Sequence, residues 1–483
     1  MTSAMGEVEP REIWKHFEAL AGIPRPSTQE AAARAYVLKL AEELGLESVV
    51  DQAGNVVVRK PAHPGREAAA VTALQGHLDM VCEKNEGTRF NFEKDAIRLV
   101  RREDWLYADG TTLGADNGVG VAAALAVMES KTIQHGPMEF VFTVEEETTL
   151  GGASAFKPGV LRARYLLNLD NEEQGTVCIG CAGGVNTRAW RKVVFQLAGA
   201  GEGFWVKVSG LKGGHSGVDI HLGRGNAVRI LGGTLQRVLE AMPAQIADLR
   251  GGSAHNAIPR EAAALVVVDA TNQERLRRIV EQFADDVRTD LGDFDPELEI
   301  TVGRAVKDAT RVLAAGDAKR AVDLMASLPH GVLAMSPDVA GLVQDSTNVA
   351  TVGVKDGVVE IVTSQRSAIE GSKEMARRLV ATVCRMAGFE VEHSGDYPGW
   401  KPEPESEIAR RSMAVYEAMY GSAPQVIAMH AGLETGVLGR NYPEMQMISI
   451  GPQIEHPHSP DERVQISSVA EFWKYLVAVL ERL

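Results

Sequence analysis

The sequence predicts an α/β protein, with a mostly parallel sheet covered by helices on both faces and interrupted by an inserted α/β domain. Near-continuous apolar segments that suit strands alternate with segments of helical periodicity, which is the pattern of a parallel sheet buried on both faces. The chain has 483 residues, more than one hydrophobic core usually serves. A second run of alternating elements begins after residue 184 and supplies the other domain.

The first domain is expected to open with two helices and to continue with strands. Helical periodicity covers 11–21 and 29–44, and Ser27 and Thr28 can cap the second helix. The elements expected next are strands 56–60 and 71–81, helix 117–130, and strands 138–145 and 165–170. Loops after the carboxyl ends of such strands are where functional sites form.

The inserted domain is predicted from an order of elements that a ferredoxin-like β-α-β-β-α-β unit would have. The expected order is strand 204–210, helix 226–240, strands near 246 and over 263–269, helix 272–291 and strand 297–304. A second half of similar type can be made from helix 308–327, a hairpin that turns at Asp356 and Gly357, helix 371–388 and strand 389–393.

The chain is expected to return to the first domain at the proline-rich segment YPGWKPEP. A helix, the strands QVIAMH and MQMISIG, and a final amphipathic helix follow it. The predicted boundaries are therefore 1–187 and 396–483 for the first domain and 188–395 for the insertion.

Composition indicates a globular protein that acts on small molecules. Hydrophobic residues make up 45% and charged residues 24% of the chain, and the formal net charge is −15. Acidic residues are spread along the chain, which argues against a nucleic-acid surface and against an anionic membrane. The N-terminus has neither a basic nor an apolar targeting region, so we expect a cytoplasmic protein. Cys178 and Cys181 form a C-x2-C pair with no second pair after it, so a structural zinc on cysteine is not predicted.

Acidic and imidazole side chains stand at or just after the predicted carboxyl ends of several strands. They are His77, Asp79, Asp116, Glu145, Glu146, Glu147, Asp170 and His458. Taken singly, each has an ordinary explanation as a structural histidine, a helix cap or a turn residue. At one edge of one sheet, however, so many carboxylates would repel one another strongly. A pair of divalent cations would remove that repulsion.

Seven motifs together resemble the zinc-dependent exopeptidase family that includes carboxypeptidase G and peptidase T. They are GHLDM, GADNG, EETTLGGA, NLD, GGHSG, NAIPR and HSPDE. Chain length and the segments SGLKGGHSG, YPGW, HAGLE and SIGP are most similar to the aminoacyl-histidine dipeptidase branch of that family, also called cytosolic non-specific dipeptidase. The resemblance covers nearly the whole chain, and it implies a catalytic domain interrupted by a lid domain.

The resemblance implies a site with two Zn²⁺ ions, although Mn²⁺ or Co²⁺ can occupy such ligands. Asp116 would bridge both metals, and its peptide bond to Asn117 would be cis. One metal would also bind His77 and Asp170, and the other would bind Glu147 and His458. Glu146 would act as the general base, and Asp79 would orient His77.

The resemblance also implies roles for residues of the inserted domain. His215 and Asn256 would stabilise the oxyanion, and Arg366 would bind a substrate carboxylate through its planar fork. The implied reaction is hydrolysis of an unblocked dipeptide, of the Xaa-His type, by attack of a hydroxide that bridges the metals. The sequence leaves the roles of Glu434 and His456 open, and it leaves open whether the protein is a homodimer in which His215 serves the partner.

Three other functions can be compared with these motifs. An N-acyl-amino-acid amidohydrolase would use the same metal site, and a non-catalytic peptide-binding protein would use the same scaffold. A serine hydrolase is disfavoured because G-x-S-x-G requires a glycine where this chain has Val218.

The three glutamates at 145–147 carry one further expectation, since alternate residues of a strand point to opposite faces. The chain must leave strand geometry there if Glu146 and Glu147 are both to reach the metals.

Overall fold

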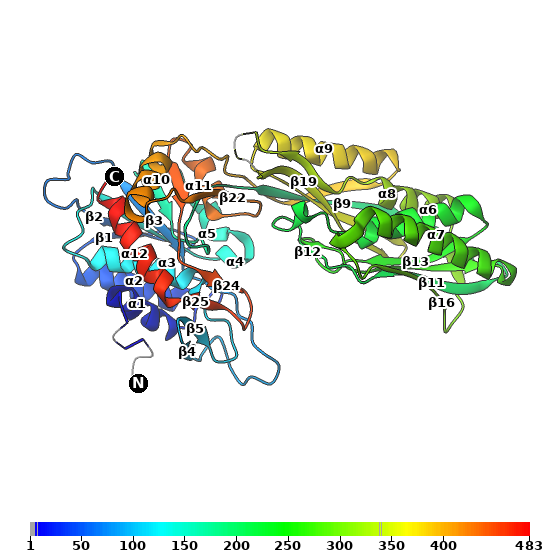
Figure 1. Cartoon of the computed structure of the whole chain (residues 1–483), viewed down its shortest axis with the longest axis horizontal. Coiled ribbons are helices and arrows are strands. Elements are labelled where there is room, and N and C mark those ends of the chain that lie inside the picture. The colour runs from blue at the N-terminus through cyan, green and yellow to red at the C-terminus, as the bar shows by residue number, and fades with distance from the viewer. Residues whose placement is uncertain (1–4, 7, 338, 340) are drawn as a thin grey trace. The chain divides into compact units, whose positions relative to one another are not determined.

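The computed structural model describes residues 5, 6, 8–337, 339 and 341–483. The chain divides into two compact units (Figure 1). Unit 1 comprises Met1–Gly180, Trp400–Ala428 and Leu433–Leu483, and unit 2 comprises Cys181–Gly399 and Met429–Gly432. The predicted insertion, 188–395, lies within the longer segment of unit 2.

Unit 1 is built on an eight-stranded sheet with the order β1-β2-β6-β3-β7-β23-β8-β22. Its strands are β1 (Glu47–Val50), β2 (Val56–Lys60), β3 (Thr72–His77), β6 (Met138–Thr143), β7 (Tyr165–Asn168), β8 (Thr176–Cys181), β22 (Gln425–Met429) and β23 (Gln446–Ser449). Every residue of β3, β6 and β7 is buried. These central strands are therefore covered on both faces, as their continuous apolar sequences predict.

The prediction of a mostly parallel sheet holds only for its centre. Strands β6, β3, β7 and β23 run parallel to one another. Strand β1 pairs with β2, β2 with β6, and β8 with β23 in the antiparallel sense. Strand β1 is antiparallel to β2 because a short turn joins them: the Asp51 carboxylate accepts the backbone N–H groups of Ala53, Gly54 and Asn55, which reverses the chain directly.

The helices of unit 1 include one that is almost wholly buried. They are α1 (Arg11–Ala21), α2 (Ala31–Glu43), α3 (Ala115–Glu129), α4 (Glu146–Thr149), α5 (Gly151–Ala155), α10 (Glu407–Tyr420), α11 (Glu434–Asn441) and α12 (Ile466–Leu480). Helix α3 is buried from Ala115 to Met128 because alanine, glycine and valine fill its sequence. It packs between α1 and β3, and its first turn carries Asp116.

A second, four-stranded sheet in unit 1 has the order β24-β25-β5-β4. Its strands are β4 (Leu99–Arg102), β5 (Trp105–Ala108), β24 (Ile454–Glu455) and β25 (Arg463–Gln465). The turn between β24 and β25 holds both His458 and Glu462, and the segment after β5 leads into α3. This small sheet therefore brings the C-terminal histidine motif and the start of α3 into one neighbourhood.

Unit 2 contains a long antiparallel sheet with the order β16-β11-β15-β13-β19-β20-β9-β21, and β18 pairs with β19 outside that path. Its strands are β9 (Gly183–Lys192), β11 (Glu202–Ser209), β13 (Gln245–Gly251), β15 (Ala262–Val268), β16 (Glu299–Arg304), β18 (Gly331–Met335), β19 (Val343–Lys355), β20 (Val358–Ser367) and β21 (Glu390–Tyr397). The predicted hairpin is confirmed, because β19 and β20 are joined at Asp356 and Gly357, both with positive φ.

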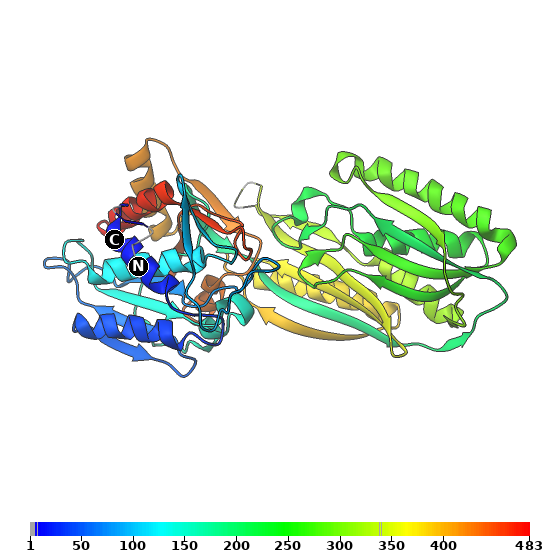
Figure 2. The same cartoon turned by 90° about the horizontal axis from the view of Figure 1, so that it is seen from below.

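The remaining elements of unit 2 are helices and short strands. They are β10 (Phe195–Leu197), β12 (Gly214–His215), η1 (Ile220–Leu222), α6 (Ala227–Ala241), β14 (Ala257–Ile258), η2 (Ala270–Asn272), α7 (Gln273–Leu291), η3 (Gly292–Phe294), β17 (Arg311–Leu313), α8 (Ala315–Ser327) and α9 (Glu370–Met386). Figure 2 shows the helices of this unit alongside its sheet. The predicted helix 308–327 was wrong at its start, because Arg311–Leu313 pairs with β10 as a strand before α8 begins.

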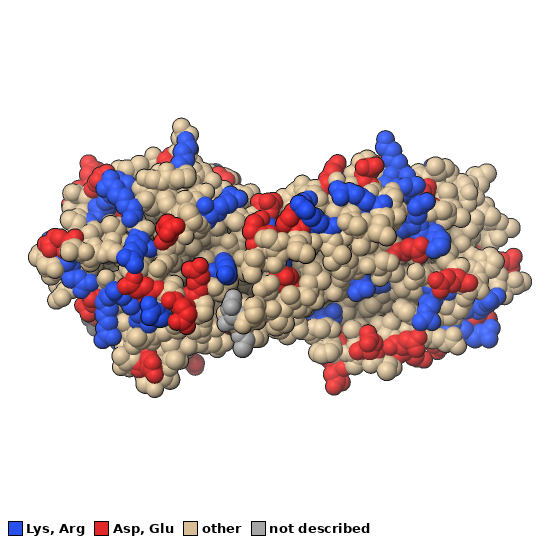
Figure 3. Space-filling model, turned by 90° about the horizontal axis from the view of Figure 1, so that it is seen from above, with Lys and Arg blue, Asp and Glu red and all other residues tan. Residues whose placement is uncertain are grey.

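Alternation along β11 explains how the sheet of unit 2 is covered. Phe204, Val206 and Val208 belong to the apolar core cluster of this unit together with Leu231, Leu235 and other helix residues, whereas Lys207 on the opposite face is exposed. Basic and acidic side chains are interspersed on the molecular face drawn in Figure 3. No helix in the described part of the chain is long and apolar enough to cross a membrane.

The close packing of α3 gives a stability test. A Cβ added at Gly120 would lie 2.3 Å from the backbone oxygen of Leu169, so Gly120→Ala should lower the free energy of unfolding by roughly 1–3 kcal/mol through overpacking. Thermal melts and denaturant titrations measure this effect. The control is Gly316→Ala in α8, where no atom lies within 4 Å of the added methyl group. Equal melting temperatures for the two variants would show that α3 does not need this glycine.

Candidate metal centre

The candidate metal centre in unit 1 forms where neighbouring parallel strands end. Strand β3 ends at His77, β6 leads into the three glutamates at 145–147, and β7 is followed by Asp170. Residue His77 on β3 is paired with Thr143 at the end of β6. The predicted convergence at one sheet edge therefore occurs, and α3 adds Asp116 while the β24–β25 turn adds His458.

Asp116 lies between two histidines and offers one carboxylate oxygen to each. Its Oδ1 is 3.0 Å from His77 Nε2, and its Oδ2 is 3.0 Å from His458 Nε2. On one side Asp170 Oδ1 lies 3.4 Å from His77 Nε2, and on the other Glu147 Oε2 lies 3.1 Å from His458 Nε2. Two triads thus share Asp116, and each places its ligand atoms close enough to hold one cation. His458, rather than His456, belongs to this cluster.

Asp79 connects His77 with the glutamate turn. Its carboxylate Oδ1 lies 3.5 Å from His77 Nδ1, the ring nitrogen that faces away from Asp116. The same carboxylate accepts the backbone N–H groups of Glu146 and Glu147, each at 3.1 Å, and the Ser27 hydroxyl at 2.8 Å. Asp79 therefore orients the histidine and the acidic turn together, a second role that the H-x-D motif alone did not indicate.

The chain leaves strand geometry at the three glutamates, as expected. Strand β6 ends at Thr143, Glu145 adopts a left-handed conformation with φ of 55°, and Glu146 and Glu147 begin the short helix α4. Glu146, Glu147 and His77 also form a third possible group of ligand atoms. The backbone N–H of Glu145 donates to Glu30, so the first glutamate has a structural neighbour of its own.

Glu462 supports the bridging aspartate through its backbone, a role for which only its place four residues after His458 gave a hint. Its carboxylate accepts the N–H groups of Leu113, Gly114, Ala115 and Asp116, at distances of 2.6, 2.9, 2.7 and 3.2 Å. Burial raises the pKa of Glu462 to about 7. The peptide bond between Asp116 and Asn117 is cis, as the resemblance implied.

Arg25 is a further supporting residue that sequence reasoning missed. It is buried, and its guanidinium donates to the backbone oxygens of Leu78 and Asp79 and, at 2.6 Å, to that of Gly114. It thus links the segment after β3 to the start of α3. An arginine in the proline-flanked sequence IPRPS resembles a surface residue, so only its tertiary contacts reveal this position.

Two more acids, Glu434 and Glu172, lie near the cluster. Glu434 is fully buried at the start of α11 and accepts hydrogen bonds from Gln75 Nε2 at 2.5 Å and Thr143 Oγ1 at 2.6 Å. Burial raises the pKa of Glu434 to about 8. Burial and the charges of Asp116 and Asp170 raise the pKa of Glu172 well above its ordinary value.

The charges of the cluster perturb one another strongly. Burial opposes ionisation of Asp116, but His458 and His77 outweigh burial and lower the pKa of Asp116. Hydrogen bonds to Asp116 and Glu147 raise the pKa of His458 to about 11. Burial raises the pKa of Glu146 well above its ordinary value, and the neighbouring charges of Asp170 and Glu147 add to that rise. The site therefore concentrates negative charge that a cation would relieve.

The donor set fits divalent metal ions. Glu147 Oε1 and Asp170 Oδ1 are buried and accept no hydrogen bond from any residue that the structure describes. Buried oxygens of this kind are costly unless they have a partner. Histidine nitrogen with carboxylate oxygen is a ligand set used by zinc and by other first-row divalent metals.

His215 and Asn256 lie side by side in unit 2. His215 on β12 pairs with Ala257 on β14, and the backbone oxygen of Asn256 accepts the N–H of Ser216 at 2.8 Å. His215 Nδ1 accepts backbone N–H groups from Gly217 and Val218. Burial and the charge of Arg366 lower the pKa of His215 to about 4. The imidazole is therefore neutral at pH 7, with its proton on Nε2.

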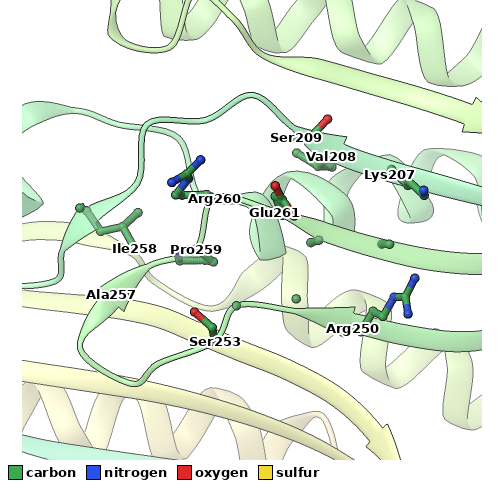
Figure 4. A pocket seen from close by; sticks show the side chains of 15 residues that line it. Lys207, Val208, Ser209, Arg250, Ser253, Ala257, Ile258, Pro259, Arg260 and Glu261 are labelled. Carbon is green, nitrogen blue, oxygen red and sulfur yellow. The ribbon is translucent and has the colours of Figure 1, made fainter. Parts of the chain in front are cut away.

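Unit 2 also contains a cavity of about 680 Å³ (Figure 4). Strands β11, β13 and β15 and the segment 257–260 line it, and Gly214, next to His215, is part of its wall. Lys207, Arg250 and Arg260 are exposed at this cavity. None of the residues that line it belongs to the histidine and carboxylate cluster, so the cavity does not mark the candidate metal centre.

An α/β sheet whose carboxyl edge gathers two histidine and carboxylate triads is typical of metal-dependent hydrolases. Residues 73–482 match the model of peptidase family M20/M25/M40. The chain is 36% identical to the cytosol non-specific dipeptidase of Escherichia coli (strain K12) over 482 residues, which are 100% of this chain and 99% of that protein. It therefore belongs to peptidase family M20/M25/M40.

Solved structures agree with this assignment. The crystal structure of aminoacylhistidine dipeptidase from Vibrio alginolyticus matches with a TM-score of 0.91 and 39% identity, over 99% of this chain and 97% of that chain. The aminopeptidase PepT of Bacillus cereus matches with a TM-score of 0.57 and 17% identity, over 99% of each chain. At that identity the second likeness shows the fold alone.

The contacts of Glu462 give a test of the site. Glu462→Gln replaces one accepting oxygen by an NH2 group that faces backbone N–H donors, so metal affinity should fall by roughly tenfold. Titration calorimetry with Zn²⁺ measures the affinity. Glu455→Gln is the control, since it removes only a partly exposed ion pair with Arg463. Unchanged affinity in Glu462→Gln would mean that this carboxylate does not hold Asp116 in place.

Proposed function

We propose that this protein is a di-zinc dipeptidase that hydrolyses the peptide bond of unblocked dipeptides, among them dipeptides with a C-terminal histidine. The observation that carries the proposal is the position of Asp116, which offers one oxygen to each of two histidine and carboxylate groups. Similarity over the whole chain to a non-specific dipeptidase and to an aminoacylhistidine dipeptidase supports the substrate class.

The ligands divide between two cation positions. His77 and Asp170 would hold one ion, Glu147 and His458 the other, and Asp116 both. When bound, the ions supply positive charge that acidifies water and stabilises an oxyanion. Zn²⁺ suits these nitrogen and oxygen donors, and Mn²⁺ and Co²⁺ suit them as well.

Glu146 is the proposed general base. Its carboxylate lies in the same group of atoms as His77 and Glu147. Burial and neighbouring carboxylates raise its pKa, which favours uptake of a proton. Glu146 would take the proton of the attacking water and then give it to the leaving amine nitrogen. Asp79 would keep Glu146 and Glu147 in place through the backbone hydrogen bonds that it accepts.

His215 is the proposed donor to the tetrahedral oxyanion. Because its Nδ1 accepts two backbone N–H groups, its Nε2–H is the group left to donate. A neutral donor of fixed orientation is suited to a charge that develops only in the transition state. Asn256, on the paired segment, would contribute a second donor through its side-chain amide.

Arg366 is the proposed receptor for the carboxylate of the substrate's second residue. It is buried with 7% of its surface exposed, and no carboxylate in the described part of the chain forms an ion pair with it. A buried guanidinium without an anion is costly, so this position favours an anionic ligand. The free carboxylate of a dipeptide meets that requirement.

Two further inferences concern the cellular location and the oligomeric state of the protein. The name of the Escherichia coli relative refers to the cytosol, which supports the cytoplasmic location expected from the sequence. A homodimer is compatible with the proposed chemistry but is not required by the ligand set, since all five metal ligands and Glu146 lie within unit 1.

A substrate panel tests the reaction. After chelation, the protein should be inactive, and Zn²⁺ should restore hydrolysis of Xaa-His and other unblocked dipeptides, with much slower cleavage of tripeptides and N-acetyl amino acids. Chromatography of the released amino acids measures each rate. Cleavage confined to the N-acetyl amino acids would favour an N-acyl-amino-acid amidohydrolase instead, and full activity without metal would refute the proposal.

A pair of variants separates the base from the ligand. Glu146→Gln should bind Zn²⁺ normally but lose turnover by at least a factor of roughly 100, because the proton acceptor is gone. Glu147→Gln should lose metal affinity first. Calorimetry and initial rates are measured on both variants. If the two lose metal and turnover to the same extent, the assignment of separate roles is wrong.

A further inference from the structure

One row of residues crosses four strands of unit 2 at Arg366. Ser346 on β19 pairs with Arg366 on β20, Arg366 pairs with Gly184 on β9, and Gly184 pairs with Tyr397 on β21. Tyr397 is thus two strands away from Arg366 across the sheet. Nevertheless, Arg366 Nη1 donates a hydrogen bond to the Tyr397 hydroxyl at 2.8 Å.

The glycine between them makes this contact possible. A Cβ added at Gly184 would lie 2.6 Å from Tyr397 Oη and 2.7 Å from Cζ, so the ring of Tyr397 passes directly over the bare backbone of β9. Gly432 approaches the same ring from the 429–432 segment, where an added Cβ would lie 2.8 Å from Cε2. The two glycines therefore fix the plane and the reach of the tyrosine.

The other neighbours of the guanidinium are neutral and weak partners. Arg366 Nη2 lies 3.5 Å from Ser216 Oγ, and Arg366 Nε has no hydrogen-bond partner among the described residues. His430 donates to or accepts from Ser346 Oγ at 2.7 Å, and burial together with the charge of Arg366 lowers the pKa of His430 to about 3. Among the described side chains, Tyr397 thus makes the one short hydrogen bond to Arg366.

The N–H donors of Arg366 therefore fall into two groups, which lie on different edges of the guanidinium. Nη1 donates to the tyrosine hydroxyl, whereas on the other edge Nε has no partner among the described residues and Nη2 has only the long contact with Ser216. A guanidinium binds a carboxylate best through two parallel N–H groups, which requires a fixed plane. An arginine has a flexible stem, so something must hold that plane before the substrate arrives.

We propose that Tyr397 is a positioning residue for substrate recognition, which holds the guanidinium of Arg366 in the orientation that receives the carboxylate of the dipeptide. This inference rests on the proposed function, in which Arg366 is the carboxylate receptor. It adds Tyr397, with Gly184 as the position that admits its ring, to the residues that set the preference for a free C-terminus.

The first test compares a dipeptide with its C-terminal amide. Tyr397→Phe keeps the ring and removes the hydroxyl, so KM for the free dipeptide should rise about tenfold, since hydrogen bonds to charged groups are worth more than neutral ones. Both kcat for that substrate and KM for the amide should change less than about twofold, because neither depends on carboxylate binding. Gly184→Ala, which displaces the ring, should give the same pattern.

The controls distinguish positioning from general damage. Tyr420→Phe, which removes a hydroxyl bonded to Glu471 in unit 1, should leave both KM values unchanged. In an Arg366→Lys background, which lacks the Nη1 donor, Tyr397→Phe should add less than about a twofold effect, since residues that act through one another are not additive.

The inference is overturned if Tyr397→Phe leaves KM for the free dipeptide unchanged, raises KM equally for dipeptide and amide, or has its full effect in the Arg366→Lys background. Failure of the wild-type protein to hydrolyse any unblocked dipeptide would instead refute the proposed function. Thermal melts of each variant are compared with the wild type, so that a KM change is interpreted only where the fold is retained.

Discussion

The fold of unit 1 holds several carboxylates at one sheet edge, and the repulsion between them is the main constraint on the site. Asp116, Glu146, Glu147 and Asp170 lie around two histidines in a largely buried region. Like charges at such distances are costly in a medium of low dielectric constant. Imidazolium at His77 and His458 offsets part of that cost, as the raised pKa values of both show. Two divalent cations would offset it more fully, which makes metal binding part of the stability of this edge.

Such a cluster must be held in place by groups that do not themselves bind metal. Asp79 accepts the N–H groups of the glutamate turn, Glu462 accepts four N–H groups around Asp116, and Arg25 connects the segment after β3 with α3. Each contact joins segments that are far apart along the chain. These contacts position the candidate ligands through their backbone and do not use the candidate ligands' own side-chain oxygens.

The candidate site residues of the two units differ in charge, since those of unit 1 are mainly carboxylates and unit 2 contributes an arginine. Unit 1 gathers carboxylates, whereas unit 2 buries Arg366, whose guanidinium has Tyr397 and Ser216 as its partners. A dipeptide is complementary to both, because its scissile carbonyl suits a cationic metal centre and its terminal carboxylate suits a guanidinium. In the proposed reaction, these two kinds of group would favour a short substrate with a free C-terminus.

The sequence by itself predicted most of the fold, and several of the residues that it nominated for the metal site do lie close together in the structure. Apolar runs identified the central strands, because residues buried on both faces must be apolar, and the motifs around His77, Asp116, Asp170 and His458 indicated metal chemistry through their residue types. Local periodicity also located the longer helices, but the short helices α5 and α11 were not predicted, and α8 begins later than predicted because pairing with β10 overrides the periodicity there. The mixed sense of the sheet was missed, since strand direction depends on partners rather than on composition.

Only the tertiary structure decided how these residues act together. No local pattern distinguishes Arg25 from a surface residue, and for Glu462 the spacing from His458 gives only a hint, because both act on backbone groups contributed by distant segments. The same holds for Tyr397, whose hydroxyl reaches Arg366 only because a glycine occupies the strand between them. Residue types state which chemistry is available, but distances between side chains are fixed by the packing of elements that the sequence separates.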